Sequence, residues 1–179
     1  MRATGIIRRI DELGRVVVPK EVRKTLKLHD GDLLEIYAKK EELVLKKYAP
    51  VSEMSKKIKD TADILAKLSG KECFITDTEN IICSSNSNME GNEIVPITDD
   101  LVRHIKINKY SNALLPYYNT IKVYERQEKK AVGQIIVPIL LDGTVYGSVI
   151  IQNDKPFLQR CEEEKLATLT AKLIAEYIC

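Results

Sequence analysis

Short apolar runs bounded by turn residues dominate the first 50 positions. Four of them predict β-strands: GIIRRI at 5–10, RVVVP at 15–19, LLEIYA at 33–38 and LVLKKY at 43–48. Residues 20–27 predict a short helix, because Pro19 fits the start of a helix and Glu21 suits the positive end of its dipole. The predicted order is β-β-α-β-β, a β-rich unit over residues 1–50.

A unit of this size buries too little apolar surface to be stable without support. Domains near 50 residues usually need disulfides, a metal or oligomerisation. The sequence predicts neither of the first two, because its four cysteines (Cys73, Cys83, Cys161, Cys179) are far apart and form no C-x-x-C pair. We therefore expect a dimer in which hairpins from two chains complete one sheet or barrel, and four reduced thiols.

Ala49, Pro50 and Val51 end the last strand, and residues 51–55 form a linker into a helix that begins near Ser52 and ends before Gly70. We expect a second domain over residues 56–179. Its first helix carries one apolar stripe: Met54, Ile58, Ala62, Leu65 and Leu68. Such a stripe can pack on the domain's own sheet or on a partner's helix.

The second domain alternates strand and helix signals. We expect a hairpin of CFITD and IICS after residue 73, a helix starting at Thr98, a strand at 121–125 and a hairpin of QIIVPILL and TVYGSVIIQ closed by Asp142-Gly143. The terminal helix carries a second apolar stripe: Leu158, Cys161, Leu166, Leu169, Leu173 and Tyr177. A sheet flanked by its first and last helices predicts an α+β, sensor-like fold.

Positive charge is concentrated at the start of the chain. Residues 1–27 contain eight Lys and Arg against three Asp and Glu, whereas the 179-residue chain contains 28 against 26. On the helix at 20–27, Val22 and Leu26 share one side while Lys20, Arg23, Lys24 and Lys27 fall within an arc of roughly 100° on the other. This basic face suits a polyanion, and the alternative is an ordinary solvated surface.

The stretches ATGIIRRIDELGRVVVPKEVRKTL and GDLLEIYAKKEELVLKKY resemble the AbrB family of transition-state regulators over nearly all of residues 3–50. The resemblance implies a swapped-hairpin barrel of two interleaved chains that binds loosely specified, A/T-rich DNA through Arg8, Arg15, Arg23 and Lys24. Arg9 is a neighbouring candidate. Lys24 stands where the family often has Arg, so the charge is kept and the bidentate fork is lost. The resemblance also implies control of late sporulation genes in the forespore, by activation or repression.

The second domain resembles a GAF domain in the order of its elements. The resemblance implies a regulatory module, and long polar loops suggest a small-molecule pocket behind residues 84–93 or 108–120. The two helix stripes, at 54–68 and 158–177, predict that the dimers pair into a tetramer.

Catalysis and membrane insertion are not expected. The chain has two histidines, His29 and His104, and neither lies beside a Cys or Ser in a catalytic arrangement, while Asp99-Asp100 is better explained as helix-start charge. The apolar run at 135–141 is broken by Pro138, and no secretory signal is visible, so we expect a cytoplasmic protein without cofactor or metal.

Two other interpretations remain open. AbrB-type barrels also occur in antitoxins, where a disordered tail neutralises a toxin. Here a patterned domain replaces that tail, which makes the antitoxin interpretation the minor one. In the other, the second domain is the principal sensor and DNA contact is weak.

Overall fold

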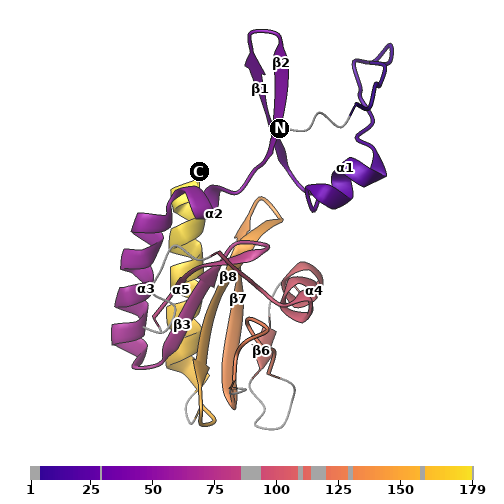
Figure 1. Cartoon of the computed structure of the whole chain (residues 1–179). Helices are drawn as coiled ribbons and strands as arrows, with labels where there is room; N and C mark the ends of the chain where they lie inside the picture. Colours follow the sequence, from indigo (N-terminus) through magenta and orange to yellow (C-terminus); the bar gives the residue numbers. More distant parts are fainter. Residues whose placement is uncertain are drawn as a thin grey trace. The chain divides into compact units, whose positions relative to one another are not determined.

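The computed structural model describes residues 5–28, 30–85, 94–108, 111–113, 120–128, 131–157 and 160–178. It divides into two compact units, residues 1–48 and 49–179 (Figure 1). Residues 51–55, predicted to be a linker, belong to the second unit: Val51 is buried in helix α2 (Pro50–Glu53), as is Pro50, which was predicted to end the first domain.

The first unit contains one helix and one hairpin. Helix α1 (Lys20–Thr25) follows Pro19, and β1 (Leu34–Lys39) pairs antiparallel with β2 (Glu42–Lys47) through a two-residue loop. The strands predicted at 5–10 and 15–19 do not form within the single chain. A strand needs a neighbour for its backbone groups, and no other described segment of this unit supplies one.

The second unit is a six-stranded antiparallel sheet in the order β5-β4-β3-β8-β7-β6. Its strands are β3 (Glu72–Thr76), β4 (Asn80–Ser84), β5 (Val95–Pro96), β6 (Ser111–Ala113), β7 (Gly133–Leu141) and β8 (Thr144–Asn153). The predicted β3–β4 and β7–β8 hairpins are confirmed. Asp142 and Gly143 both have positive φ, 48° and 77°, as a type I′ turn requires.

Helices cover both faces of this sheet. Helices α3 (Ser55–Ser69) and α5 (Arg160–Ile178) lie side by side on one face, and α4 (Asp99–Asn108) lies on the other (Figure 1). The strands alternate accordingly: Cys73 and Ile75 of β3 enter the core beneath α3 and α5, whereas Phe74 enters the core beneath α4. The α+β prediction with flanking helices is confirmed.

Each of the two predicted helix stripes is partly packed and partly exposed. On α3, Ile58, Ala62 and Leu65 pack against the sheet, whereas the predicted Leu68 is exposed. On α5 the predicted stripe residue Leu166 packs against the same core beside alanines and Ile174, whereas the predicted Leu169 and Leu173 are exposed. Leu158 lies outside the described residues, and the side chain of Cys161 is likewise not described.

The buried cysteines behave as apolar core residues. Burial raises the pKa of the Cys73 thiol to about 11 and that of Cys83 to about 12. Both are free thiols in the core beneath α3 and α5. Cys179 lies outside the described residues.

Candidate nucleic-acid interface

The first basic residues flank a tight turn held by Asp11. Its Oδ1 accepts hydrogen bonds from the backbone N–H groups of Leu13 (3.0 Å) and Arg15 (2.8 Å). The Gly14 N–H donates to the Asp11 carbonyl at 2.9 Å, and the φ of Gly14 is +76°, a conformation that favours glycine. The turn therefore depends on an Asp side chain and on a glycine three residues later.

Arg15 is tied to the same carboxylate. Its Nε lies 2.7 Å from Asp11 Oδ2, although the Arg15 side chain is 71% exposed. Hydrogen bonds from the Arg15 amide, and then from its guanidinium, hold the pKa of Asp11 below its ordinary value. The contact uses Nε, so the two terminal guanidinium nitrogens are not part of it.

Arg23 and Lys24 lie on α1. Arg23 Nη1 is 3.3 Å from Oδ1 of Asp30, whose side chain is 99% exposed, so this pair is loose. Helix α1 ends in a Schellman arrangement: the Leu28 N–H donates to the Arg23 carbonyl and the Lys27 N–H to the Lys24 carbonyl. Lys27 occupies the left-handed position of this motif, with φ of 51°.

All five predicted DNA contacts are exposed on the first unit: Arg8, Arg9, Arg15, Arg23 and Lys24. Arg8 and Arg9 precede the Asp11 turn, Arg15 closes it, and the other two follow on α1. The sequence reasoning missed the carboxylates that hold two of the arginines. The i, i+4 spacing of Asp11 and Arg15 around Gly14 was the available signal.

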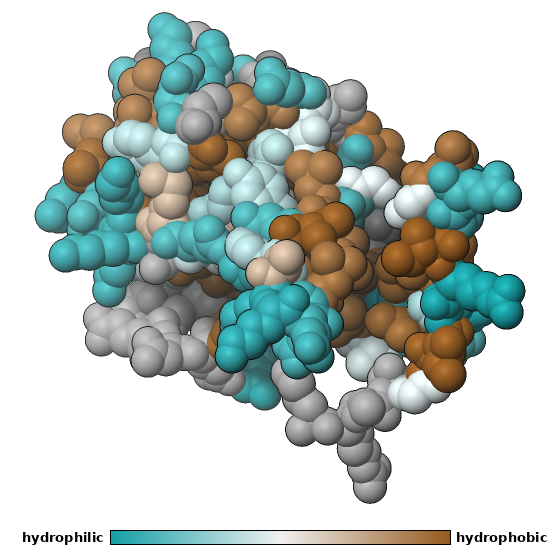
Figure 2. Space-filling view, turned by 90° about the horizontal axis from the view of Figure 1, so that it is seen from above, coloured by the Kyte–Doolittle hydropathy of each residue, from teal (hydrophilic) through white to brown (hydrophobic). Residues whose placement is uncertain are grey.

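Beside these cations the first unit exposes its apolar side chains. None of the residues described between 5 and 48 is buried. Large hydrophobic side chains that are exposed include Ile7, Ile10, Leu13, Val17, Ile36 and Leu43. Figure 2 shows hydrophobic side chains at the molecular surface among hydrophilic ones. A surface of this kind marks an interface.

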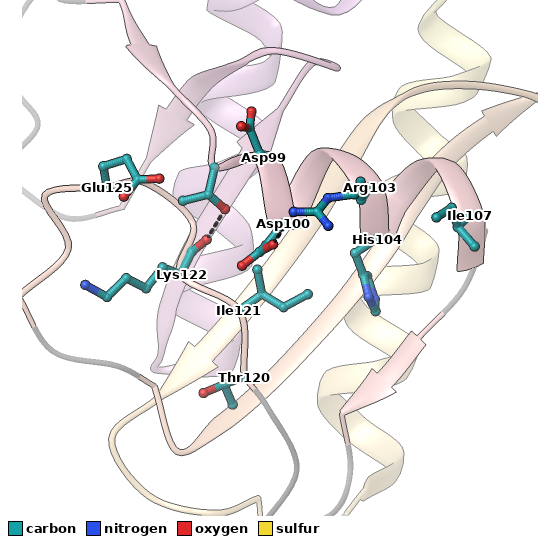
Figure 3. Close-up of a pocket in the computed structure, with 10 residues that line it drawn as sticks. Asp99, Asp100, Arg103, His104, Ile107, Thr120, Ile121, Lys122 and Glu125 are labelled. Atoms are coloured by element: carbon teal, nitrogen blue, oxygen red, sulfur yellow. Dashed lines mark hydrogen bonds and ion pairs between the residues drawn. The ribbon is translucent and has the colours of Figure 1, made fainter.

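The second unit contains a cavity of about 810 Å³ between α4 and residues 120–125 (Figure 3). The prediction of a strand at 121–125 is wrong. The Gln134 side chain, and not a neighbouring strand, forms hydrogen bonds with the backbone N–H and carbonyl of Ile121. Thr98 Oγ1 donates to the Lys122 carbonyl at 2.7 Å and joins α4 to this segment.

Charged side chains of both signs line the cavity. Arg103 Nη2 lies 2.8 Å from Asp100 Oδ1, and burial lowers the pKa of His104. Asp99 and Asp100 do lie at the start of α4, as predicted, and they also line the cavity. Of the regions predicted to flank a pocket, 86–93, 109–110 and 114–119 lie outside the described residues, as does His29. Among the described residues, no three His, Cys, Asp or Glu form a group that could hold a metal ion, and no helix is long and apolar enough to span a membrane.

Two protein families match the chain. The model described as "Stage V sporulation protein T C-terminal, transcription factor" matches residues 53–178. The model described as "Antidote-toxin recognition MazE, bacterial antitoxin" matches residues 7–53. The two matches together span both units.

Curated relatives give the same division. Stage V sporulation protein T of Bacillus subtilis (strain 168) is 33% identical over 169 residues, 94% of this chain and 94% of the relative. Transition state regulatory protein AbrB of the same organism is 42% identical over 89 residues, 45% of this chain and 92% of that protein.

Among solved structures, the GAF domain of an Acinetobacter phosphoenolpyruvate-protein phosphotransferase aligns with a TM-score of 0.54 at 15% identity, over 72% of this chain and 90% of that one. This likeness shows the fold alone. The chain belongs to the stage V sporulation protein T family of transcription factors, with an AbrB-type first unit and a second unit of GAF-like fold.

Proposed function

We propose that this protein regulates transcription by binding DNA through the basic surface formed by Arg8, Arg9, Arg15, Arg23 and Lys24. The observation that carries the proposal is that all five side chains are exposed on a unit whose apolar residues are also unburied. Lys and Arg bind phosphates with little regard to sequence, and A/T-rich DNA offers a narrow, strongly negative minor groove. The preference for loosely specified A/T-rich sites follows from these two effects.

The DNA-binding form is a dimer built from two first units. Without a second copy, none of the residues described between 5 and 48 is buried, so the unit has no core. Residues 5–10 and 15–19 have the apolar pattern of strands and pair with no strand in the described part of the chain. Pairing with the same segments of a second chain gives them hydrogen-bond partners and buries the exposed Ile and Val side chains. A two-fold dimer presents the five cations twice.

Binding of the full-length protein to an A/T-rich and a G/C-rich duplex across a salt series tests the DNA proposal. We expect a steep negative slope of log K against log salt, shallower in Arg15→Ala and Arg23→Ala. Lys59→Ala, an exposed lysine of α3 in the second unit, is the matched control and should leave the slope unchanged. Absence of binding at low salt would exclude a DNA-binding role.

The second unit contributes assembly and sensing. Exposed apolar side chains on α3 (Ile64, Leu68) and α5 (Leu169, Leu173) form a surface on which dimers pair into a tetramer. The cavity beside α4 accepts a small polar molecule, because it is lined by both acidic and basic side chains. A thermal-shift screen of metabolites that finds no stabilisation of the second unit would count against a ligand.

The biological setting comes from the relatives. Similarity over 94% of stage V sporulation protein T supports control of sporulation genes. A location in the cytoplasm of the forespore is part of our proposal. The match of residues 7–53 to an antitoxin model favours the second candidate function, an antitoxin-like DNA-binding module. The folded second unit stands where an antitoxin has its toxin-binding tail, so this candidate ranks second.

A further inference from the structure

Two of the proposed DNA-contacting arginines are held by carboxylates, and the two contacts differ in kind. Asp11 reaches Arg15 twice, accepting from its amide at 2.8 Å and from its Nε at 2.7 Å. It also accepts from the Leu13 amide at 3.0 Å. Asp30 reaches Arg23 once, at 3.3 Å, from a side chain that is 99% exposed. The first carboxylate is fixed by the backbone, and the second is free to move.

A fixed carboxylate fixes the guanidinium that it contacts. An exposed arginine side chain samples many rotamers and loses that conformational entropy when it binds DNA. If a contact already holds the side chain in one orientation, binding costs less entropy. The orientation of the guanidinium plane decides which acceptors the side chain can reach, because the N–H donors form a rigid, planar fork. The Asp11 contact uses Nε, so the donors of the two terminal nitrogens are left for another acceptor.

We propose that Asp11 is a positioning residue for DNA recognition: it orients the Arg15 guanidinium toward the groove and so sets the preference between DNA sequences. The inference rests on the proposed DNA-binding function. An oriented arginine can enter the narrow, negative minor groove of A/T-rich DNA, whereas a mobile one contacts any phosphate within reach. Asp30 lacks the backbone anchors, so it only lowers the local positive charge beside Arg23.

The test compares Asp11→Asn with Asp30→Asn in the full chain. Both remove one negative charge. In Asp11→Asn the side-chain oxygen still accepts from the two backbone amides, whereas the new amide nitrogen cannot accept from Arg15 Nε. Dissociation constants are measured for an A/T-rich and a G/C-rich duplex at one salt concentration. We expect the ratio of the affinity for the A/T-rich duplex to the affinity for the G/C-rich duplex to fall by about three- to tenfold in Asp11→Asn. In Asp30→Asn both affinities should rise together, with the ratio unchanged.

A double-mutant cycle separates positioning from a general structural effect. Arg15→Lys keeps the charge and removes the fork, so adding Asp11→Asn to it should change the ratio no further. Thermal unfolding of each variant shows whether the fold is retained.

An unchanged ratio in Asp11→Asn, or an equal fall in Asp30→Asn, would overturn the inference while leaving DNA binding intact. The same fall on the Arg15→Lys background would also overturn it, since Asp11 would then act without the guanidinium. Failure of the unmodified protein to bind either duplex would instead refute the proposed function.

Discussion

The side-chain amide of Gln134 forms both backbone hydrogen bonds that a neighbouring strand would form with Ile121. Its Oε1 accepts from the Ile121 N–H and its Nε2 donates to the Ile121 carbonyl, each at 2.8 Å. Gln134 is fully buried on β7. One side chain therefore attaches the wall of the cavity to the sheet.

Gln134→Leu should destabilise the second unit. Leucine of similar size leaves the N–H and carbonyl of Ile121 without these partners, which costs about 2 to 3 kcal/mol in the free energy of unfolding. Chemical denaturation measures the loss, with the exposed Glu128→Gln as a control that should change stability little. If Gln134→Leu loses no more stability than Glu128→Gln, water must replace the hydrogen bonds of the Gln134 amide without cost.

Gly147 lies so close to β3 that no side chain fits there. A Cβ at this position would overlap with the Thr76 carbonyl oxygen, a backbone atom that cannot move aside without separating β3 from β8. We expect Gly147→Ala to lower the free energy of unfolding by about 3 kcal/mol. Gly143→Ala is the comparison: it has positive φ in open space and should cost only about 1 kcal/mol. Equal losses in the two variants would show that the strands can part freely.

Lys27 combines a positive charge with an unfavourable backbone conformation. Replacing it should therefore raise the stability of the first unit and lower its affinity for DNA. Lys27→Gly removes the strain of φ at 51° and should stabilise the first unit by about 0.5 to 1 kcal/mol. Lys27 is not one of the five proposed contacts, but it ends α1 beside Lys24, so the loss of its charge should weaken DNA binding and make the salt dependence of binding shallower.

Lys40→Gly is matched to this variant, because Lys40 has φ of 46° in the β1–β2 loop, outside the proposed DNA surface. It should gain stability and keep DNA affinity. A parallel loss of affinity in both variants would indicate that charge anywhere on the unit matters equally.

Local signals predicted most elements. The misses occurred where a side chain supplies the hydrogen bonds or where, as we propose, a second chain does. Asp142-Gly143 specified its hairpin because the turn needs only local geometry. Residues 121–125 looked like a strand, and nothing local shows that Gln134 would bind them from 13 positions away. Residues 5–10 look like a strand that the single chain does not complete. The candidate cations were visible as charge, whereas the contact of Asp11 with Arg15 had only their i, i+4 spacing around Gly14 as a signal.

The lowered pKa of Asp11 predicts a pH dependence. Because the folded state favours the ionised carboxylate, its stabilisation is present above the ordinary pKa of 3.8 and is lost as the pH falls through the lower, folded value. The stability difference between the unmodified protein and Asp11→Asn should therefore be largest near neutral pH and shrink below about pH 4. An NMR titration of the Asp11 carboxyl with a midpoint at or above 3.8 would contradict this.

The proposed tetramer depends on the outward face of α5. Leu173 is 42% exposed there although the opposite side of the helix is packed on the sheet, so a charge at this position should disturb assembly and spare the fold. We expect Leu173→Glu to sediment as a dimer where the unmodified protein sediments as a tetramer, with an unchanged unfolding temperature. Lys172→Glu, an exposed neighbour on the same turn, should keep the tetramer. A monomer in the Leu173→Glu variant would place the dimer contact on α5 instead of the first unit, and a pure monomer of the unmodified chain at micromolar concentration would refute both contacts.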